Sequence, residues 1–210
     1  ITNKLFKKEV VYLCNTVIEP NESAGPDGLE NLDLIARFVR ATKAPARDAT
    51  LAATPSAQHG AELFAKIGCE TCHVSSLVTA PTGTKIDGGA VTVPEALGSK
   101  TIHPYSDYLL HDVGTGDGIV VFPSETDPTF DPATASAVAS PAELQSTQNK
   151  FRTAPLWGVR MRPRLMHDGA SDTLGDAILR HKGEALQTTQ AFQKLGSSDQ
   201  QDLLNFLKSL

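Results

Sequence analysis

The chain has 210 residues, of which 40% are hydrophobic and 20% are charged. This composition is ordinary for a globular protein and excludes a coiled coil, a collagen-like chain and a largely disordered one. The formal net charge of −5 argues against nucleic acid as the partner, because such binding needs a clustered basic surface. No run approaches the roughly 18 consecutive apolar residues that a membrane span requires.

Two helical patterns occupy the first third of the chain. Apolar residues recur at three- and four-residue spacing over residues 29–40, which predicts an amphipathic helix. A second stripe over residues 57–67 follows Ser56, a predicted N-cap, and stops at Gly68. We therefore expect residues 1–55 to form an N-terminal extension with one helix.

The middle of the chain, residues 74–150, shows no sustained helical period and is rich in Gly, Pro, Ser and Thr. Such a long connection inside a compact domain is usually functional or partly disordered. Residues 101–113 are more apolar, so we expect them to pack, whereas residues 124–140 are typical of a solvated surface loop. The pattern predicts a long loop insertion at about residues 74–150.

Two further helices are predicted near the C-terminal end. Thr173, with Asp176 three residues later, resembles a capping box and opens a helix over residues 174–182. Ser198, with Gln201 three residues later, opens another helix, in which three leucines share one face.

A C-x-x-C-H motif occupies residues 69–73, directly after the second helical pattern. This is the form of c-type haem attachment: the thiols of Cys69 and Cys72 each add to one vinyl group of the porphyrin, and His73 reaches the iron from the same face. A zinc site would need a second pair of ligands at similar spacing, and a thioredoxin-like site would need a βαβ pattern. Neither is present, so we predict one covalent haem c with His73 as an axial iron ligand.

The attachment chemistry also bears on the compartment. Because assembly of a c-type haem requires reduced thiols and exported haem, we expect the protein to work in the periplasm or otherwise outside the cytoplasm. The chain begins at Ile1 without an initiator Met or the layout of a secretion signal, so we expect the original N-terminus to be absent. Cys14 is left over, and it is either an inert buried thiol or a partner for another chain.

The other axial ligand is sought among the remaining His and Met residues. His181 stands three residues after Ile178 and seven after Leu174, so on the predicted helix it shares their apolar face, where a buried imidazole needs a partner. It could instead cap the helix C-terminus, where a cation interacts favourably with the dipole. Met161 and Met166 are the alternative ligands. A thioether ligand would raise the reduction potential of the haem, whereas a second imidazole would lower it. We predict a low-spin bis-His haem.

Several other residues are candidates for the haem environment. Haem propionates often form hydrogen bonds with arginine, so one or two arginines of a basic segment, Arg160 foremost, are candidates for binding them. A solvated basic face is the simpler interpretation of this segment. It contains Arg152, Arg160, Arg162 and Arg164. Trp157 is expected to pack against the ring, with an electron-relay role as the sharper alternative. His59 is expected at the surface. Three aspartates lack EF-hand spacing and are expected to be solvated, which leaves calcium binding open: Asp112, Asp117 and Asp127.

Several separated segments resemble one family. Residues 151–158, 166–169 and 173–185, with residues 103–107 and 110–114, are similar to the C-terminal haem domain of bacterial di-haem oxidoreductases. The branch is the one assigned to thiol oxidation, and it is related to the di-haem cytochrome c peroxidases. The similarity covers nearly the whole chain.

This resemblance implies roles for two histidines. The position matching His181 supplies the distal ligand of the C-terminal haem, usually as Met in the peroxidases and as His in this branch. His167 matches a recurrent histidine near the haem pocket, and we expect it to be a pocket residue and not a ligand.

The chain departs from the family in carrying one C-x-x-C-H motif where the family has two haem domains. It is either a fragment of a longer protein or a single-haem descendant, and the peroxide chemistry of the N-terminal haem does not carry over. We predict a mainly α, cytochrome c-like haem domain over residues 56–210 that exchanges single electrons with another redox protein or haem domain, alone or within a larger complex. The alternatives are a peroxidase-like or thiol-oxidising haem enzyme, and a structural subunit.

Overall fold

The computed structural model describes residues 31–86, 89, 91–116 and 148–210. The chain divides into two compact units, residues 1–44 and residues 45–210. In the first unit, α2 (Asn31–Ala41) confirms the amphipathic helix predicted from the sequence. The second unit begins at Pro45, so it takes in residues that the sequence assigned to the N-terminal extension.

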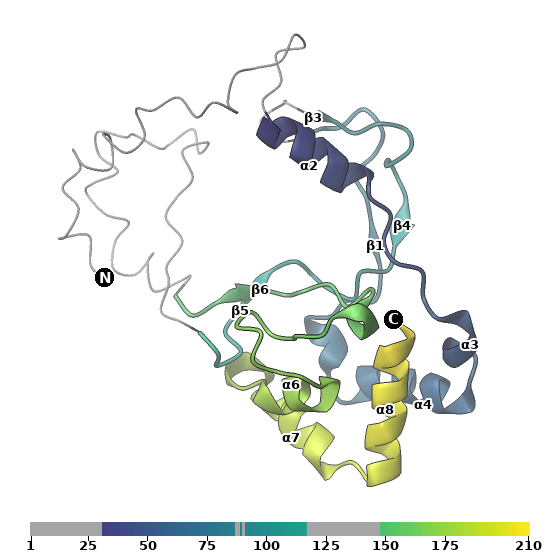
Figure 1. The fold of residues 1–210 in the computed structure, drawn as a ribbon, viewed down its shortest axis with the longest axis vertical. Coiled ribbons are helices and arrows are strands. Elements are labelled where there is room, and N and C mark those ends of the chain that lie inside the picture. The colour runs from purple at the N-terminus through teal and green to yellow at the C-terminus, as the bar shows by residue number, and fades with distance from the viewer. Residues whose placement is uncertain (1–30, 87–88, 90, 117–147) are drawn as a thin grey trace, which may run out of the picture. The chain divides into compact units, whose positions relative to one another are not determined.

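The core of the second unit forms where α4 (Pro55–Lys66) packs against α8 (Ser197–Ser209). Figure 1 shows the two helices side by side, with α3 (Ala49–Ala52) next to them. Gly60 permits this close approach, because a Cβ atom there would lie 2.0 Å from the carbonyl oxygen of Asp202. The buried side chains at the crossing are Leu63, Phe64, Leu203, Phe206 and Leu207.

The start of α4 differs from the prediction. Thr54 is the N-cap, and its hydroxyl accepts a hydrogen bond from the backbone N–H of Ala57. Pro55 follows at the first helical position, where a missing N–H removes no helical hydrogen bond. Ser56, the predicted N-cap, therefore lies inside the helix, where its hydroxyl donates to the carboxylate of Asp202.

Among the described residues, the loops between α4 and α6 are tied by three antiparallel strand pairs. These are β1 (Leu77–Val78) with β4 (Thr101–Ile102), β2 (Lys85–Ile86) with β3 (Val91–Thr92), and β5 (Leu110–His111) with β6 (Phe151–Arg152). Residues 101–113 pack only in part, since Pro104 and Ser106 are fully buried whereas Leu109 and Leu110 are exposed. The surface loop predicted at residues 124–140 lies outside the described residues.

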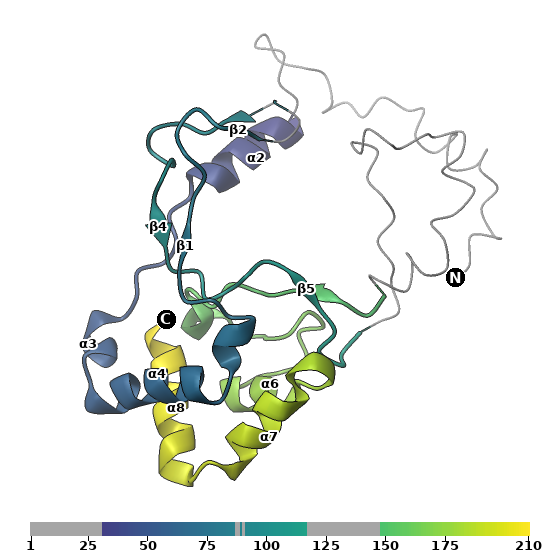
Figure 2. The same cartoon turned by 180° about the vertical axis from the view of Figure 1, so that it is seen from behind.

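The C-terminal part holds α6 (Leu174–Arg180), η4 (Gly183–Ala185), α7 (Leu186–Lys194) and α8. Figure 2 shows α6 beside α7. Thr173 caps α6 as predicted, accepting a 3.0 Å hydrogen bond from the N–H of Asp176, and α8 starts one residue before Ser198. The sequence did not predict α7, because its polar stretch buries only Thr189 and Phe192.

Two short turns, η1 (Cys69–Thr71) and η3 (Val159–Met161), complete the helical segments. Each named strand is only two residues long, so the described structure is mainly helical, and this confirms the predicted class. Within the described ranges, no helix has the length and apolar character that crossing a bilayer would require.

Candidate functional site

The C-x-x-C-H motif begins where α4 ends. Ile67 is the C-cap of α4, and Gly68 then adopts a φ of 93°, a left-handed conformation that favours glycine. This turn leads into η1, which starts at Cys69, with Cys72 and His73 directly after it. The packing of α4 in the core therefore fixes where the motif starts.

Both motif thiols border one large cavity, and both are free. Burial raises the pKa of Cys69 to about 12, and burial also raises the pKa of Cys72. A reactive or redox-active cysteine needs a lowered pKa, because the thiolate is the nucleophile. These two thiols therefore lack the character of a catalytic pair, whereas thioether attachment does not depend on a stable thiolate in the folded chain.

His73 is oriented by a residue 32 positions further along the chain. Its Nδ1–H donates to the carbonyl oxygen of Tyr105 at 2.8 Å; because a carbonyl can only accept, the lone pair of the ring is left on Nε2. Burial lowers the pKa of His73 to about 4, so the imidazole is neutral near pH 7. Tyr105 holds a φ of 51°, a conformation that costs on the order of 1 kcal/mol in a residue with a Cβ atom.

His181 presents a second imidazole that is also held by a backbone carbonyl. Its Nδ1–H donates to the carbonyl oxygen of Ala177 at 2.7 Å, which again leaves the lone pair on Nε2. The predicted helix over residues 174–182 is too long, because His181 is the C-cap of α6 with extended backbone angles. Helical phase therefore does not place this side chain. The hydrogen bond from Nδ1 to Ala177 orients the ring instead. Because this bond uses Nδ1, Nε2 stays available to bind a metal.

The two imidazoles border the same cavity, whose volume is about 920 Å³. This volume is at the upper end of the roughly 300–1,000 Å³ found for ligand sites, which suits a large group. The apolar lining comes from α4, α6, α8 and the loops: Phe64, Ile67, Val113, Phe151, Leu156, Val159, Leu165, Leu174, Ala177, Ile178, Leu203 and Leu207.

The four arginines of the basic segment have different surroundings. Arg152 and Arg162 line the cavity, and their guanidinium groups have no hydrogen-bond or ion-pair partner in the described part of the chain. Arg164 also lines it but is paired with Asp172. Arg160 lies outside the cavity lining, and its guanidinium donates to two backbone carbonyls, those of Leu210 and Ala46. The structure therefore favours Arg152 and Arg162, not Arg160, as partners for an anionic group in the cavity.

Of the remaining predicted site residues, some line the cavity and others lie outside it. His167 and Met166 line the cavity, and the His167 ring stacks on Phe151 with the ring centroids 3.6 Å apart. Trp157 is not among the lining residues, and neither is Met161, which is 72% exposed. Of the two methionines, only Met166 is therefore placed to compete with His181.

A charged cluster that the sequence did not predict lies at the cavity wall. His111 lies between two carboxylates, with Nε2 2.8 Å from Asp107 and Nδ1 2.8 Å from Glu184. The hydrogen bond with Glu184, followed by that with Asp107, raises the pKa of His111. The backbone N–H of Asp107 also donates to the carbonyl of Cys72 at 2.8 Å. The cluster thus joins the cysteine loop to the segment after His181, and no local pattern signals it because Glu184 is 73 residues from His111.

Two other expectations concern residues away from the cavity. The imidazole of His59 is 45% exposed and pairs with Asp202 across α4 and α8, as expected for a surface residue. Of the three aspartates weighed for calcium, Asp112 accepts a hydrogen bond from the N–H of Gly114, while Asp117 and Asp127 lie outside the described residues.

Comparison with known proteins gives a family and one structural likeness. The sequence profile of the family described as "Di-haem oxidoreductase, putative peroxidase" matches residues 20–210. A chain of Kuenenia stuttgartiensis hydrazine synthase, in a structure pressurised with 20 bar xenon, is 26% identical with a TM-score of 0.47; the match covers 85% of this chain and 55% of that one. This chain thus spans about half the length of that relative. No curated protein matches.

Proposed function

Because this chain belongs to the di-haem oxidoreductase family, we propose that residues 45–210 form a cytochrome c-like domain that holds one covalent haem c and transfers single electrons. One observation carries this proposal. His73 and His181 each hold the proton on Nδ1 by a hydrogen bond to a carbonyl, so each keeps an Nε2 lone pair at the wall of the same cavity.

The donor set and the lining fit this cofactor. Cys69 and Cys72 would supply the two thioethers, and His73 and His181 the axial nitrogens, inside a cavity with mostly apolar walls. When bound, such a haem supplies a centre that gains and loses one electron at a time. Arg152 is one of two unpaired guanidiniums that would meet the propionates through charge-assisted hydrogen bonds, the other being Arg162.

The hydrogen bonds to both imidazoles favour electron transfer over catalysis at the metal. Hydrogen bonds to the second ring nitrogen fix the tautomer and orientation of a ligating His. If both imidazoles bound the iron of a haem, peroxide or oxygen would have to displace one of them. Bis-His ligation also lowers the potential relative to His-Met ligation.

The test is removal of the distal imidazole in the haem-loaded protein. His181→Ala is expected to convert a low-spin ferric spectrum to a high-spin one and to let the reduced protein bind carbon monoxide. Met166→Ala is the matched control, since Met166 lines the same cavity, and it should keep the low-spin spectrum. An unchanged absorption and electron paramagnetic resonance spectrum in His181→Ala would overturn the ligand assignment.

The family description supports a second candidate, a haem peroxidase. In that case the native protein would have an open or easily opened sixth position. Rapid spectral change on adding hydrogen peroxide to the wild-type protein, in either oxidation state, would favour the enzyme. Absence of peroxide and carbon monoxide binding favours the electron carrier.

The family name implies two haems, whereas the sequence holds one C-x-x-C-H motif. We infer that the electron partner is a second haem domain or another redox protein, and that the protein works outside the cytoplasm, where c-type haem is attached. Intact mass and a haem count of the native polypeptide would test the first inference. Recovery of the haem-loaded chain from a periplasmic fraction would test the second.

A further inference from the structure

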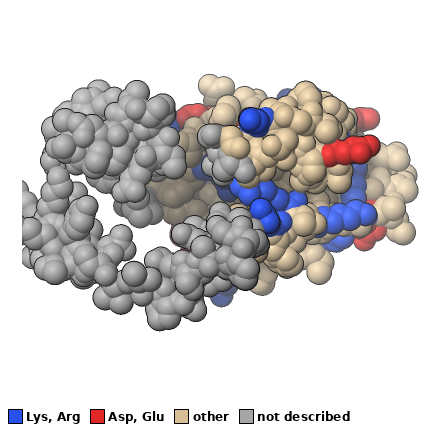
Figure 3. Space-filling view, turned by 90° about the horizontal axis from the view of Figure 1, so that it is seen from above, with Lys and Arg blue, Asp and Glu red and all other residues tan. Residues whose placement is uncertain are grey.

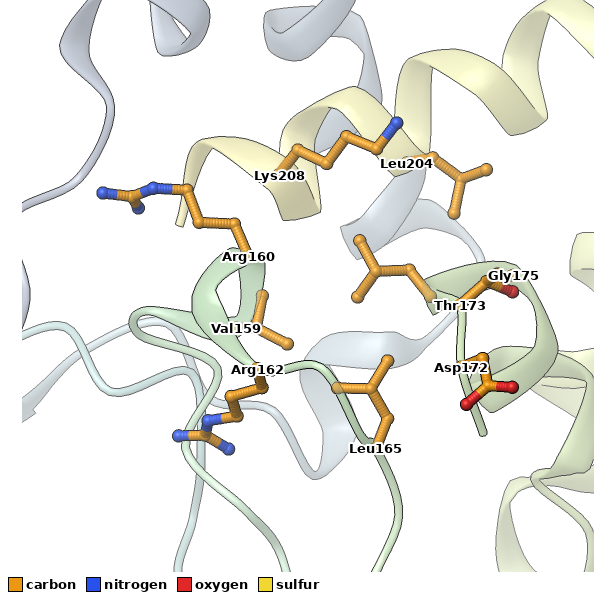
Figure 4. A pocket seen from close by; sticks show the side chains of 10 residues that line it. Val159, Arg160, Arg162, Leu165, Asp172, Thr173, Gly175, Leu204 and Lys208 are labelled. Atoms are coloured by element: carbon orange, nitrogen blue, oxygen red, sulfur yellow. The ribbon is translucent and has the colours of Figure 1, made fainter. Parts of the chain in front are cut away.

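A second hollow lies between η3, the start of α6 and the end of α8, and Figure 4 shows its lining side chains. We call it the α8 groove, and its volume is about 600 Å³. Four residues line both this groove and the large cavity: Val159, Arg162, Leu165 and Leu174. The same side chains thus separate the groove from the proposed haem.

The α8 groove carries excess positive charge. Arg160 donates to the carbonyls of Leu210 and Ala46 at 2.5 and 2.6 Å, which holds its guanidinium at the rim. Lys208 is exposed, and its ammonium group makes no hydrogen bond or ion pair within the described ranges. Asp172 is the carboxylate among the lining residues, and it is already paired with Arg164.

This local charge differs in sign from the net charge of the chain, which is −5. Figure 3 shows that side chains of both signs share the molecular surface, so net charge does not describe every patch. Met161, next to Arg160 in η3, adds an apolar side chain that is 72% exposed. An exposed apolar side chain beside cations is suited to a partner whose surface carries negative charge.

We propose that the α8 groove is the docking surface for an acidic one-electron carrier protein. The proposal rests on the proposed electron-transfer function and adds the site and the chemistry of the partner. A carrier seated there would be separated from the haem by the shared wall. One electron passes from the reduced carrier to ferric iron: the carrier is oxidised by one electron, the iron is reduced by one, and no bond forms or breaks.

The experiment measures reduction of the haem-loaded protein by a reduced plant-type ferredoxin, a small acidic carrier, in stopped flow at low ionic strength. Lys208→Glu is expected to lower the second-order rate constant about fivefold, and Lys208→Gln about twofold, because steering depends on local charge. The matched control is Lys194→Glu, the same charge reversal at an exposed lysine of α7 outside the groove. It should leave the rate within about 1.5-fold.

Salt dependence gives an independent result. The wild-type rate is expected to fall as salt is added, since attraction between unlike charges is screened. An encounter governed by the net charge of −5 would instead be repulsive, and the rate would rise with salt. A rising rate, or equal rates for Lys208→Glu and Lys194→Glu, would overturn the proposal.

Two further arms separate this proposal from other outcomes. The first uses octanoate, a carboxylate with an apolar tail, in calorimetry. Suppose that octanoate binds the wild-type protein saturably and does not bind Lys208→Glu, while ferredoxin reduces both proteins at the same rate. The groove is then a small-molecule site, and the docking proposal fails. Duroquinol, a small uncharged reductant, tests the haem alone. Fast reduction by duroquinol with no response to ferredoxin rejects the groove only, whereas no reduction by either rejects the electron-transfer function.

Discussion

The two imidazoles that border the large cavity are held by contacts of different range. His73 donates to Tyr105, on a loop far along the chain, and that loop is fixed in turn by the buried hydroxyl of Ser106, which donates to the carbonyl of Thr153 at 2.7 Å. His181 donates to Ala177, four residues earlier on its own helix. The orientation of His73 therefore depends on tertiary structure, whereas that of His181 depends mainly on the end of one helix.

The same difference appears in the packing around each histidine. The C-x-x-C-H motif follows α4, which meets α8 so closely that a Cβ at Gly60 has no room. His181 follows α6, a helix of seven residues that buries only Ala177. We expect the cavity wall around His73 to be the rigid part of the site and the wall around His181 to be the part that loosens first.

The largest expected effect is at the α4–α8 crossing. Gly60→Ala would place a Cβ atom 2.0 Å from the carbonyl oxygen of Asp202, and overpacking against a backbone atom should destabilise the protein by about 3 kcal/mol. In Gly175→Ala, on α6, the new Cβ meets nothing within 4 Å, so stability should stay equal or rise by up to about 1 kcal/mol. Urea unfolding followed by circular dichroism measures both, and equal midpoints would contradict the comparison.

A smaller effect is expected at the helix N-caps. Thr54→Ala and Thr173→Ala each remove a side-chain acceptor at the start of α4 or α6, at a cost of about 1 kcal/mol. Only Thr173→Ala acts on the helix that orients His181, so only this variant should speed carbon monoxide binding to the reduced protein. Thr173→Ser keeps the acceptor and should behave as wild type. Equal carbon monoxide kinetics in Thr54→Ala and Thr173→Ala would show that α6 does not control the distal ligand.

The smallest effect concerns the His111 cluster that joins the two walls. The pKa of His111 is raised above its ordinary value of 6.5 by hydrogen bonds with Glu184 and Asp107, so its contribution to stability is complete below pH 6.5 and is lost as the pH rises through the raised pKa. The hydrogen bond from His111 lowers the pKa of Glu184, whose contribution is present above its ordinary value of 4.5 and is lost as the pH falls through the lowered pKa. The cluster therefore stabilises most between about pH 4.5 and 6.5.

His111→Gln should flatten the fall in unfolding midpoint between pH 6.5 and 9. Glu184 is nearly half exposed, so the difference should stay below about 1 kcal/mol. The measurement is urea unfolding of wild type and variant across this pH range. Parallel pH profiles would mean that another group produces the dependence.

Local rules predicted a large part of the fold. The amphipathic helix α2, the Thr173 cap and the end of α4 at Gly68 follow from spacing and cap chemistry, and the structure confirms them. Two predicted helix boundaries were wrong where more than one residue could start or end the helix. Thr54 caps α4 in place of Ser56, and α6 ends at Arg180, two residues before the predicted end. The helix α7 has no clear apolar stripe, so packing against its neighbours decides that it forms.

The sequence by itself determined the C-x-x-C-H motif, because Cys69, Cys72 and His73 lie within five consecutive residues. It also placed His181 as a candidate from a local pattern. Only the tertiary structure decided which side chains share the cavity, since Tyr105, Glu184 and the arginines come from segments far apart. It brought Arg152 and Arg162 to the cavity wall, left Trp157 and Arg160 outside it, and placed Met161 at the surface. Cap and motif rules act over a few residues, whereas a cavity wall is set by how helices and loops pack against one another.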